Sequence, residues 1–478
     1  MHSTPTTSLY IGGTSAPQKP SRLVILGLDG VPYSLAQTLC KAGHTPNLAR
    51  LMATTTNPSS ITGLNSEACA ALHATPYSGP MSAELPELSP VNWTSFYTGE
   101  GPEEHGVFGF TRINASTYEL SLADFTQVGI PTIFDKLGSQ GYTSRIVNLP
   151  NTYPARGLRT SIMNANCMMI SGFVAHDLPR AVFPPFLMGP LMSCGYKLEA
   201  DTSRGSREPL YLLQELRATL ASRRAALQLL WPDLAWDCFV FVLTETDRLF
   251  HFLWDAVVDV HHHMHTACMD FLRHWDALIG DLLDRIDMVN RQNSSPIRLM
   301  VMADHGFTGL ETEIDLNVFL QSEGYLHLTP PTLQNNELDA TRILPQSTAF
   351  ALDPSRIYLH TRERFARGQL SQSAAASLLP ALREKLLRLT YQGRPVLKAV
   401  HTADELYQGS KRPMAPDLVC EAYAGFDLKA KFNRTTLFGH FGRTGTHTVH
   451  DAFFYDSQGF QAQRVRDVGV EVLRHFGM

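Results

Sequence analysis

The sequence lacks paired cysteines, long apolar runs and an excess of one charge, and each absence excludes a class of protein. Its 478 residues include seven cysteines, an odd number with no Cys-x-x-Cys pair, so a disulfide-stabilised secreted domain is not expected. No apolar run reaches the roughly 18 residues of a membrane-spanning helix, and residues 1–20 lack the apolar centre of a signal peptide. The net charge of −5 creates no field that attracts nucleic acid or anionic membranes. We therefore expect a cytoplasmic protein with neither a membrane nor a nucleic acid polymer as partner.

Apolar runs that alternate with helical segments indicate the fold class. Strands are expected at residues 23–28, 143–148, 238–243, 298–303 and 417–420. Helices are expected at residues 33–42, from about 93, and at 131–139, 210–230, 252–260, within 258–290 and at 373–389. This alternation predicts an α/β fold with a mostly parallel sheet that helices cover on both faces.

The composition divides the chain into regions. Residues 1–21 are rich in Ser, Thr and Pro and are expected to be disordered. Residues 22–154 and 236–478 are expected to form the α/β domain. Residues 155–235 contain several Pro and Met residues and are interpreted as a cap inserted into that domain, where it would shape the pocket for a leaving group. Residues 53–88 have no clean periodicity and are expected to be a long loop or insertion.

Three predicted strands are followed by acidic residues, namely Asp29, Asp247 and Asp304. Ligands of open α/β sheets bind outside the carboxyl ends of the strands. Any one of these residues is equally well explained as a helix N-cap. However, His251 follows Asp247 by four residues and His305 follows Asp304 directly. Carboxylate and imidazole together suit Zn²⁺ or Mn²⁺, so a metal site is the stronger interpretation.

Ser89 precedes an expected helix. Free backbone N–H groups and the positive end of the helix dipole at such a position can hold a phosphate group. Taken alone, the residue fits a helix N-cap as well as it fits a nucleophile.

The order of these segments resembles the alkaline phosphatase superfamily, and within it the type I phosphodiesterase/nucleotide pyrophosphatase branch with its microbial phosphohydrolase relatives. The resemblance covers about residues 22–460. It implies an alkaline phosphatase-like α/β fold and hydrolysis of a small phosphate ester. The segments that carry it are Asp29-Gly30, Ser89 with Thr98-Gly99-x-x-Pro102-x-x-His105-Gly106, Asp247-Arg-Leu-Phe-His251, Asp304-His305-Gly306-Phe307 and Gly445-Thr446-His447.

The resemblance also implies a set of site residues and two divalent metal ions, Zn²⁺ in the first place and Mn²⁺ as the alternative. Ser89 would be the nucleophile, because metal coordination activates a hydroxyl group that is otherwise a poor one. The two cations would offset the charge of the transferring phosphoryl group, and a phospho-Ser89 intermediate would then be hydrolysed. One ion would be held by Asp247, His251 and His447, and the other by Asp29, Asp304 and His305 with Ser89.

One departure from the branch concerns the substrate. The branch has an Asn a few residues after the His-Gly segment, where it binds a phosphate oxygen, and this chain has Phe110 near that position. Asn92, one helical turn after Ser89, is expected to substitute for it. Arg112 or Arg248 is expected to add positive charge. Monoester and diester substrates both stay open, and the sequence does not indicate an oligomeric state.

The remaining histidines are interpreted as structural. His261, His262, His263 and His265 cannot all face one ion on regular structure. His105 fits a structural role in its turn. His440 and His450 flank His447, which fits the Gly-Thr-His segment better.

Several alternative functions share parts of this pattern. A sulfatase needs a C/S-x-P-x-R segment, and residues 89–93 lack both its Pro and its Arg in place. A phosphonate hydrolase or a phosphomutase could use the same metal ligands and therefore stays open. A catalytically inactive binding protein is the alternative outside enzymes, but such a protein has no need for the complete set of site residues.

Overall fold

The computed structural model describes residues 20–54, 75–157, 166–293, 295–330 and 336–478. The predicted disorder of residues 1–21 and most of the predicted loop 53–88 lie outside this part of the chain.

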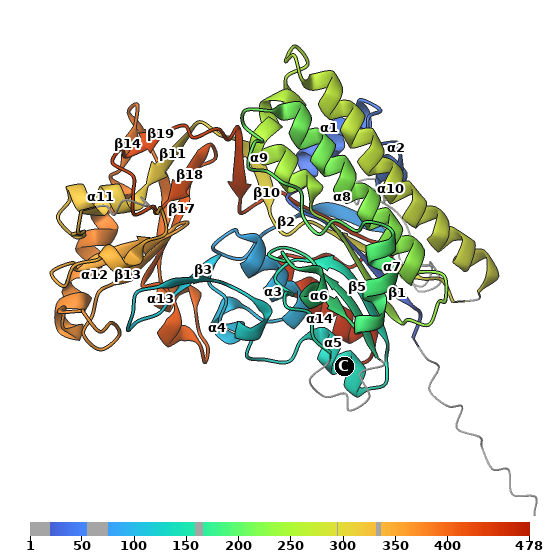
Figure 1. Ribbon diagram of the computed structural model, residues 1–478, viewed down its shortest axis with the longest axis horizontal. Helices are drawn as coiled ribbons and strands as arrows, with labels where there is room; N and C mark the ends of the chain where they lie inside the picture. Colours follow the sequence, from blue (N-terminus) through green and yellow to red (C-terminus); the bar gives the residue numbers. More distant parts are fainter. Residues whose placement is uncertain (1–19, 55–74, 158–165, 294, 331–335) are drawn as a thin grey trace, which may run out of the picture.

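An eight-stranded sheet forms the centre of the protein (Figure 1). Five neighbouring strands run parallel in the order β9, β1, β8, β5, β6, and antiparallel strands complete both edges. Every residue of β1 and β8 is buried, because helices cover both faces of the sheet. The predicted α/β class is therefore confirmed. The strands are β1 (Leu23–Leu28), β2 (Tyr77–Met81), β5 (Ser144–Leu149), β6 (Cys167–Ser171), β7 (Val182–Phe183), β8 (Cys238–Leu243), β9 (Arg298–Met302) and β21 (Ala452–Asp456).

Two groups of helices pack on the two faces of the sheet (Figure 1). One group consists of α1 (Tyr33–Lys41), α2 (Pro46–Ala53), α8 (Pro209–Leu230), α9 (Glu245–Val258) and α10 (His265–Gln292). The other consists of α3 (Ser89–Thr98), α5 (Ile133–Ser139) and α14 (Val465–His475).

The packing of α14 against α3 depends on a glycine. A Cβ atom at Gly469 would lie 2.0 Å from the carbonyl oxygen of Phe96, so a larger residue would push the two helices apart. This close contact fixes the helix that begins with Ser89.

Residues 166–235 contribute to the sheet and the core of the central domain. β6 and β7 lengthen the sheet at one edge, and α8 packs against α9 and α10. Leu212, Leu213 and Leu216 of α8 are buried in the same core as β1 and β8. The described part of the segment expected as a cap at 155–235 thus contributes apolar side chains to the main core, and its role over the pocket stays a prediction.

A smaller lobe arises instead within the C-terminal part (Figure 1). It has an antiparallel sheet in the order β12, β13, β17, β16 and an apolar core of its own. The antiparallel pair β10 (Gly306–Gly309) and β20 (Gly445–Thr448) connects it to the central domain. Its elements are β11 (Thr312–Asp315), α11 (Leu316–Ser322), β12 (Ala349–Leu352), β13 (Arg356–Leu359), α12 (Gln372–Leu387), β14 (Thr390–Tyr391), β15 (Arg394–Pro395), β16 (Leu397–Thr402), α13 (Ala403–Leu406), β17 (Leu418–Ala422), β18 (Phe426–Lys429) and β19 (Phe438–Gly439).

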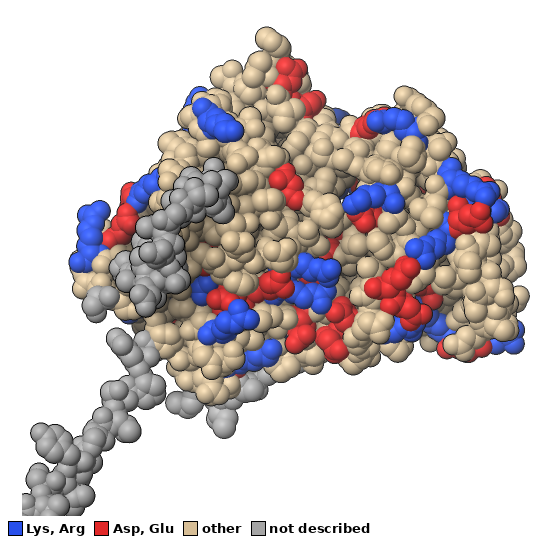
Figure 2. Space-filling model, turned by 180° about the vertical axis from the view of Figure 1, so that it is seen from behind, with Lys and Arg blue, Asp and Glu red and all other residues tan. Residues whose placement is uncertain are grey.

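Short elements complete the described chain, and its surface is mixed in charge. Within the described ranges, no helix has the length and apolarity that crossing a membrane requires. Basic and acidic side chains are interspersed on the face that Figure 2 shows. The short elements are α4 (Pro102–His105), β3 (Thr111–Ile113), β4 (Leu120–Leu122), α6 (Leu178–Ala181) and α7 (Met188–Ser193).

His105 ties the turn after α4 to α3, in agreement with the structural role that the sequence indicated. Its Nδ1 accepts a hydrogen bond from the Val107 N–H (3.1 Å), which leaves Nε2 to donate to the Ser95 hydroxyl (3.0 Å). Gly106 follows with φ +83°, a conformation that favours glycine. Burial lowers the pKa of His105 to about 3, and protonation of Nδ1 would also destroy the bond to Val107.

This low pKa predicts an acid-sensitive fold. The unfolded chain takes up a proton near pH 6.5, whereas folded His105 does so only near pH 3. Stability is therefore complete above pH 6.5 and falls as the pH drops, by up to about 1.4 kcal/mol per unit. Thermal unfolding of metal-free protein between pH 7 and pH 4 measures this, with His105→Gln as the comparison. The wild type should lose stability more steeply than the variant, and parallel curves would contradict the assignment.

Candidate active site

The predicted site residues meet at the carboxyl ends of the parallel strands. Asp29 follows β1 and Asp304 follows β9, and these two strands are paired. α9 begins directly after β8, on the other side of β1, and carries Asp247 and His251 in its first two turns. The helix expected at 252–260 therefore begins earlier, at Glu245, which places these two residues on one helical face.

Ser89 is the first residue of α3, and His447 lies in β20. The helix expected from about Trp93 begins four residues earlier, because Leu88 is still extended and Pro90 is readily accommodated in the first turn. Ser89 is thus not an N-cap, and its hydroxyl lies 3.3 Å from Nε2 of His305.

Asp247, His251 and His447 form the first group that could hold a metal ion. Nε2 of His447 lies 3.0 Å from Nε2 of His251 and 3.1 Å from Oδ1 of Asp247. The Nδ1 atoms of the two rings face backbone carbonyl groups. Nδ1 of His251 lies 3.3 Å from the carbonyl oxygen of Gly445, and Nδ1 of His447 lies 2.9 Å from that of Glu87. Such bonds orient the imidazole rings and leave both Nε2 atoms free to bind one cation.

Asp29, Asp304 and His305 form the second group. Nε2 of His305 lies 3.3 Å from Asp304 Oδ2 and 3.8 Å from Asp29 Oδ1. All three residues are buried, and neither oxygen of Asp29 nor Oδ2 of Asp304 has a hydrogen-bond partner in the described structure. Buried carboxylates without donors are costly, and a divalent cation is the partner that removes this cost. The residues present therefore fit a metal ion.

The two groups are neighbours and share one electrostatic environment. The rings of His305 and His447 stack with centroids 3.7 Å apart. Burial raises the pKa of Asp29 well above its ordinary value, and the charges of Asp304 and Asp247 add to the effect. Burial also lowers the pKa values of His251 and His305, which keeps both rings neutral, as metal ligands must be.

Asp247 behaves differently from Asp29. Burial alone would raise the pKa of Asp247, but the neighbouring His251, His447 and Arg248 outweigh it and hold this pKa well below its ordinary value. Asp247 is therefore ionised and ready to bind a cation.

Two expected substrate-binding residues are not brought to the site. Asn92 is fully buried, and its side chain accepts from the Glu84 N–H (2.6 Å) and donates to the carbonyl group of Leu88 (3.1 Å). Arg112 is exposed on β3 and lines a separate cavity beside Arg356. Asn92 lies about one helical turn after Ser89, which led to the prediction, but the side chain of Asn92 points into the loop before α3.

Asn92 consequently supports the loop that positions Ser89. The replacement Asn92→Ala is expected to lower the stability of the fold by about 1–3 kcal/mol, because two backbone groups lose their partner. Comparison of thermal midpoints and kcat measures the effect. A normal midpoint combined with a large loss of kcat would return Asn92 to the substrate site.

The cavity over the first metal group has a volume of about 340 Å³ and is lined by Ser89, Asp247, His251 and His447. Phe110 and Phe173 contribute an aromatic wall, with ring centroids 5.9 Å apart. Phe110 therefore lies in the site, as its place in the motif indicated, but offers no hydrogen bond. Thr202 also lines this cavity, so the segment expected as a cap does reach the pocket.

Sequence analysis missed most charged residues of this cavity. Lys429, Lys431, Asp427 and Arg443 come from the small lobe or from the segment that returns from it. They lie in no recognisable motif, and only the docking of the lobe brings them to the metal ligands. Arg248, which the sequence did indicate, is held by Asp247 (2.7 Å) and Glu199 (3.2 Å).

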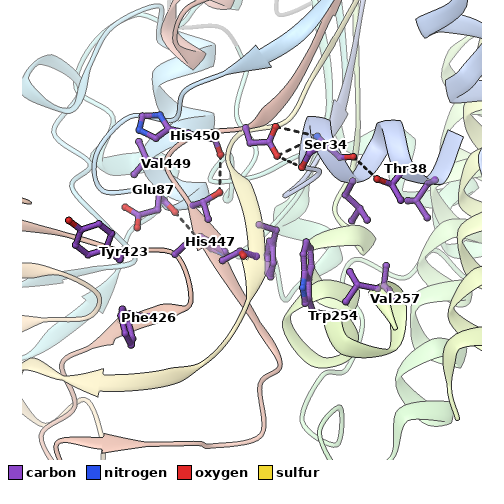
Figure 3. Close-up of a pocket in the computed structure, with 18 of the residues that line it drawn as sticks. Ser34, Thr38, Glu87, Trp254, Val257, Tyr423, Phe426, His447, Val449 and His450 are labelled. Carbon is purple, nitrogen blue, oxygen red and sulfur yellow. Dashed lines mark hydrogen bonds between the residues drawn. The ribbon is translucent and has the colours of Figure 1, made fainter. Parts of the chain in front are cut away.

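A second cavity of about 750 Å³ lies beside the first and is mainly apolar (Figure 3). Trp254 and Val257 of α9 line it, as do Tyr423 and Phe426 of the small lobe. His447 and Glu87, joined by the hydrogen bond drawn in Figure 3, line both cavities. Burial raises the pKa of the Glu87 carboxyl group to about 7.

Comparisons with known proteins agree with this geometry. The model of the family "Type I phosphodiesterase / nucleotide pyrophosphatase" matches residues 23–451. Phosphonoacetate hydrolase from Sinorhizobium meliloti 1021 superimposes with a TM-score of 0.61 at 14% identity, over 99% of this chain and 100% of that one. Murine ectonucleotide pyrophosphatase/phosphodiesterase 5 gives 0.53 at 12% identity, over 96% and 95%. A mutant of the alkaline phosphatase PafA gives 0.53 at 13% identity, over 96% of both chains. The comparison with curated proteins finds no match.

The fold is shared with hydrolases of phosphorus compounds that include the alkaline phosphatase PafA, and at its edge lie two groups of residues that could each hold a metal ion. More narrowly, the chain belongs to the type I phosphodiesterase/nucleotide pyrophosphatase family, whose model covers most of its length. It is an enzyme that acts on phosphate esters.

Proposed function

We propose that the enzyme hydrolyses a small phosphate ester with Ser89 as its nucleophile and two divalent ions. Asp247, His251 and His447 would hold one ion, and Asp29, Asp304 and His305 would hold the other. The observation that carries the proposal is the position of Ser89, 3.3 Å from His305, which itself lies beside buried carboxylate oxygens that have no hydrogen-bond partner among the described residues. The residues match the donor types that Zn²⁺ or Mn²⁺ prefers, and we propose Zn²⁺.

The chemistry follows from the position of each group. When bound, the ions supply positive charge that favours the ionised hydroxyl group and neutralises phosphoryl oxygens. Ser89 Oγ attacks phosphorus in line with the leaving oxygen, so that the P–O bond to the alcohol breaks as the bond to Ser89 forms. The N-terminus of α3 adds favourable dipole charge at the phosphoryl group. Water then cleaves phospho-Ser89, which releases phosphate and restores the hydroxyl group.

Hydrolysis of paired aryl phosphate monoesters and diesters by metal-loaded protein tests the proposal. Turnover of either class that depends on Ser89 supports it, and the ratio of the two rates assigns the substrate class. Absence of turnover with Zn²⁺ and with Mn²⁺ on both classes would contradict it.

A phosphonate is the second candidate substrate. The structural superposition covers the whole of a phosphonoacetate hydrolase chain. In addition, Phe110 stands near the position where the nucleotide pyrophosphatase branch is expected to have its phosphate-binding Asn. The same attack by Ser89 would then break a P–C bond, with a proton transferred to the leaving carbon. Release of phosphate from phosphonoacetate, measured beside the aryl phosphates, distinguishes the two candidates.

We also propose a cytoplasmic location and a small-molecule substrate. The six cysteines within the described ranges all carry free thiol groups, which favours a reducing compartment. The mixed charges on the face shown in Figure 2 favour a small substrate over a nucleic acid polymer.

A further inference from the structure

Two basic side chains, Lys429 and Arg443, line the cavity that contains Ser89 and the first metal group. Lys429 ends β18 in the small lobe, and Arg443 lies two residues before β20. The Lys429 side chain is 10% exposed and that of Arg443 is 35% exposed. One cation is therefore set into the wall and the other lies at the edge of the cavity.

The charges of these two residues are only partly compensated. Nζ of Lys429 lies 2.8 Å from Oδ2 of Asp427, and Nη1 of Arg443 lies 4.0 Å from the same oxygen. The two cations thus share the Asp427 carboxylate as their direct partner, and Asp353 lies near enough to Lys429 for the lysine charge to lower the pKa of Asp353.

The neighbouring Lys431 shows the opposite arrangement. Its Nζ lies 2.9 Å from Glu337 and 3.1 Å from Asp353, so two carboxylates neutralise one cation. Lys431 therefore has two direct carboxylate partners, whereas Lys429 and Arg443 have one between them.

Arg443 also has unused hydrogen-bond donors close to the metal ligands. Its Nη1 lies 3.4 Å from Nδ1 of His251, whose Nε2 faces His447 and Asp247. Among the described residues, no group accepts a hydrogen bond from Nε or Nη2 of Arg443. A planar guanidinium fork with free donors matches the two oxygens of a carboxylate or a phosphate.

The aromatic wall and Arg248 do not take this role. Phe110, Phe173 and Phe252 have no donor, and Asp247 and Glu199 already hold the guanidinium group of Arg248. A second negative group of a ligand would therefore be recognised at Lys429 and Arg443.

We propose that the substrate carries a second anionic group, a carboxylate or a further phosphate, which binds Arg443 and Lys429 while its phosphoryl group lies at Ser89. This inference rests on the proposed function and narrows its substrate class to small, doubly anionic phosphate compounds. The closeness of Arg443 to His251 requires that only a few bonds separate the two anionic groups.

Three synthetic substrates with metal-loaded protein test the inference. They are the phosphate esters of glycolate and of glycolamide, and ethylene glycol bisphosphate. The glycolate ester, the bisphosphate or both should exceed the neutral amide in kcat/KM by about tenfold or more, as charge-assisted hydrogen bonds do. The better of the two anionic substrates identifies the second group as a carboxylate or a phosphate.

Substitutions then show which residues cause the preference for the anionic substrates. Arg443→Gln and Lys429→Gln should each move the anionic-to-amide ratio of kcat/KM toward one, and Arg443→Lys should keep part of it. Arg394→Gln is the matched control, because Arg394 pairs with Glu311 on the surface of the same lobe and should keep the wild-type ratio. A wild-type ratio near one, or a ratio unchanged in both Gln variants, overturns the inference although phosphate esters are still hydrolysed. Failure to hydrolyse all three substrates and aryl phosphates would instead contradict the proposed function.

Discussion

Replacement of Ser89 by alanine is expected to abolish turnover and to leave the fold nearly unchanged. The loss of an activated nucleophile lowers kcat by about 10⁴-fold or more in enzymes that form a covalent intermediate. The Ser89 hydroxyl has one side-chain contact, to His305, and alanine is tolerated at the first position of a helix. The rate on an aryl phosphate, the metal content and the circular dichroism spectrum together measure the effect.

Ser95 provides the matched control for this substitution. It lies on the same helix, but its hydroxyl donates to the carbonyl group of Val91 (2.9 Å) and contacts His105, away from the metal ligands. Ser95→Ala should lower stability by about 1 kcal/mol and keep most of the activity. Near-normal turnover in Ser89→Ala would assign the nucleophile to another group.

Removal of metal ions is expected to abolish activity and to lower the stability of the central domain. Both oxygens of Asp29 and Oδ2 of Asp304 are buried and have no hydrogen-bond donor among the described residues, so the metal-free site retains an uncompensated cost. A metal ion that binds only the folded chain stabilises the fold by about 4 kcal/mol when the ion concentration is a thousandfold above its Kd. Dialysis against a chelator should therefore lower the thermal midpoint as well as the rate.

Elemental analysis and reconstitution complete this experiment. Purified protein should contain two divalent ions per chain, and added Zn²⁺ or Mn²⁺ should restore activity after dialysis. Asp304→Asn, which weakens only the second group, should lower the metal content toward one ion. An unchanged rate and midpoint after complete chelation would remove the metal ions from the mechanism.

The sequence by itself determined four of the five parallel strands of the central sheet and the residues that meet at their carboxyl ends. Apolar strands such as 238–243 are recognisable because both faces of a parallel sheet are buried. Asp29 directly follows such a strand and Asp304 follows another after one residue, so their convergence results from the rule that parallel strands end at one edge. Asp247 and His251 are one helical turn apart, a distance that the local chain sets.

Only the tertiary structure decided which of the other residues reach the site. Asn92 was predicted to approach the substrate, but its amide group is more stable when it satisfies buried backbone groups of the preceding loop. The segment predicted as a cap completes the main core, because its apolar side chains gain more by burial there.

Lys429 and Arg443 reach the cavity through the docking of a lobe, a long-range arrangement that leaves no periodic pattern in the sequence. Local order along the chain thus determined the proposed metal ligands and the proposed nucleophile, whereas long-range packing determined the walls of the cavity around them.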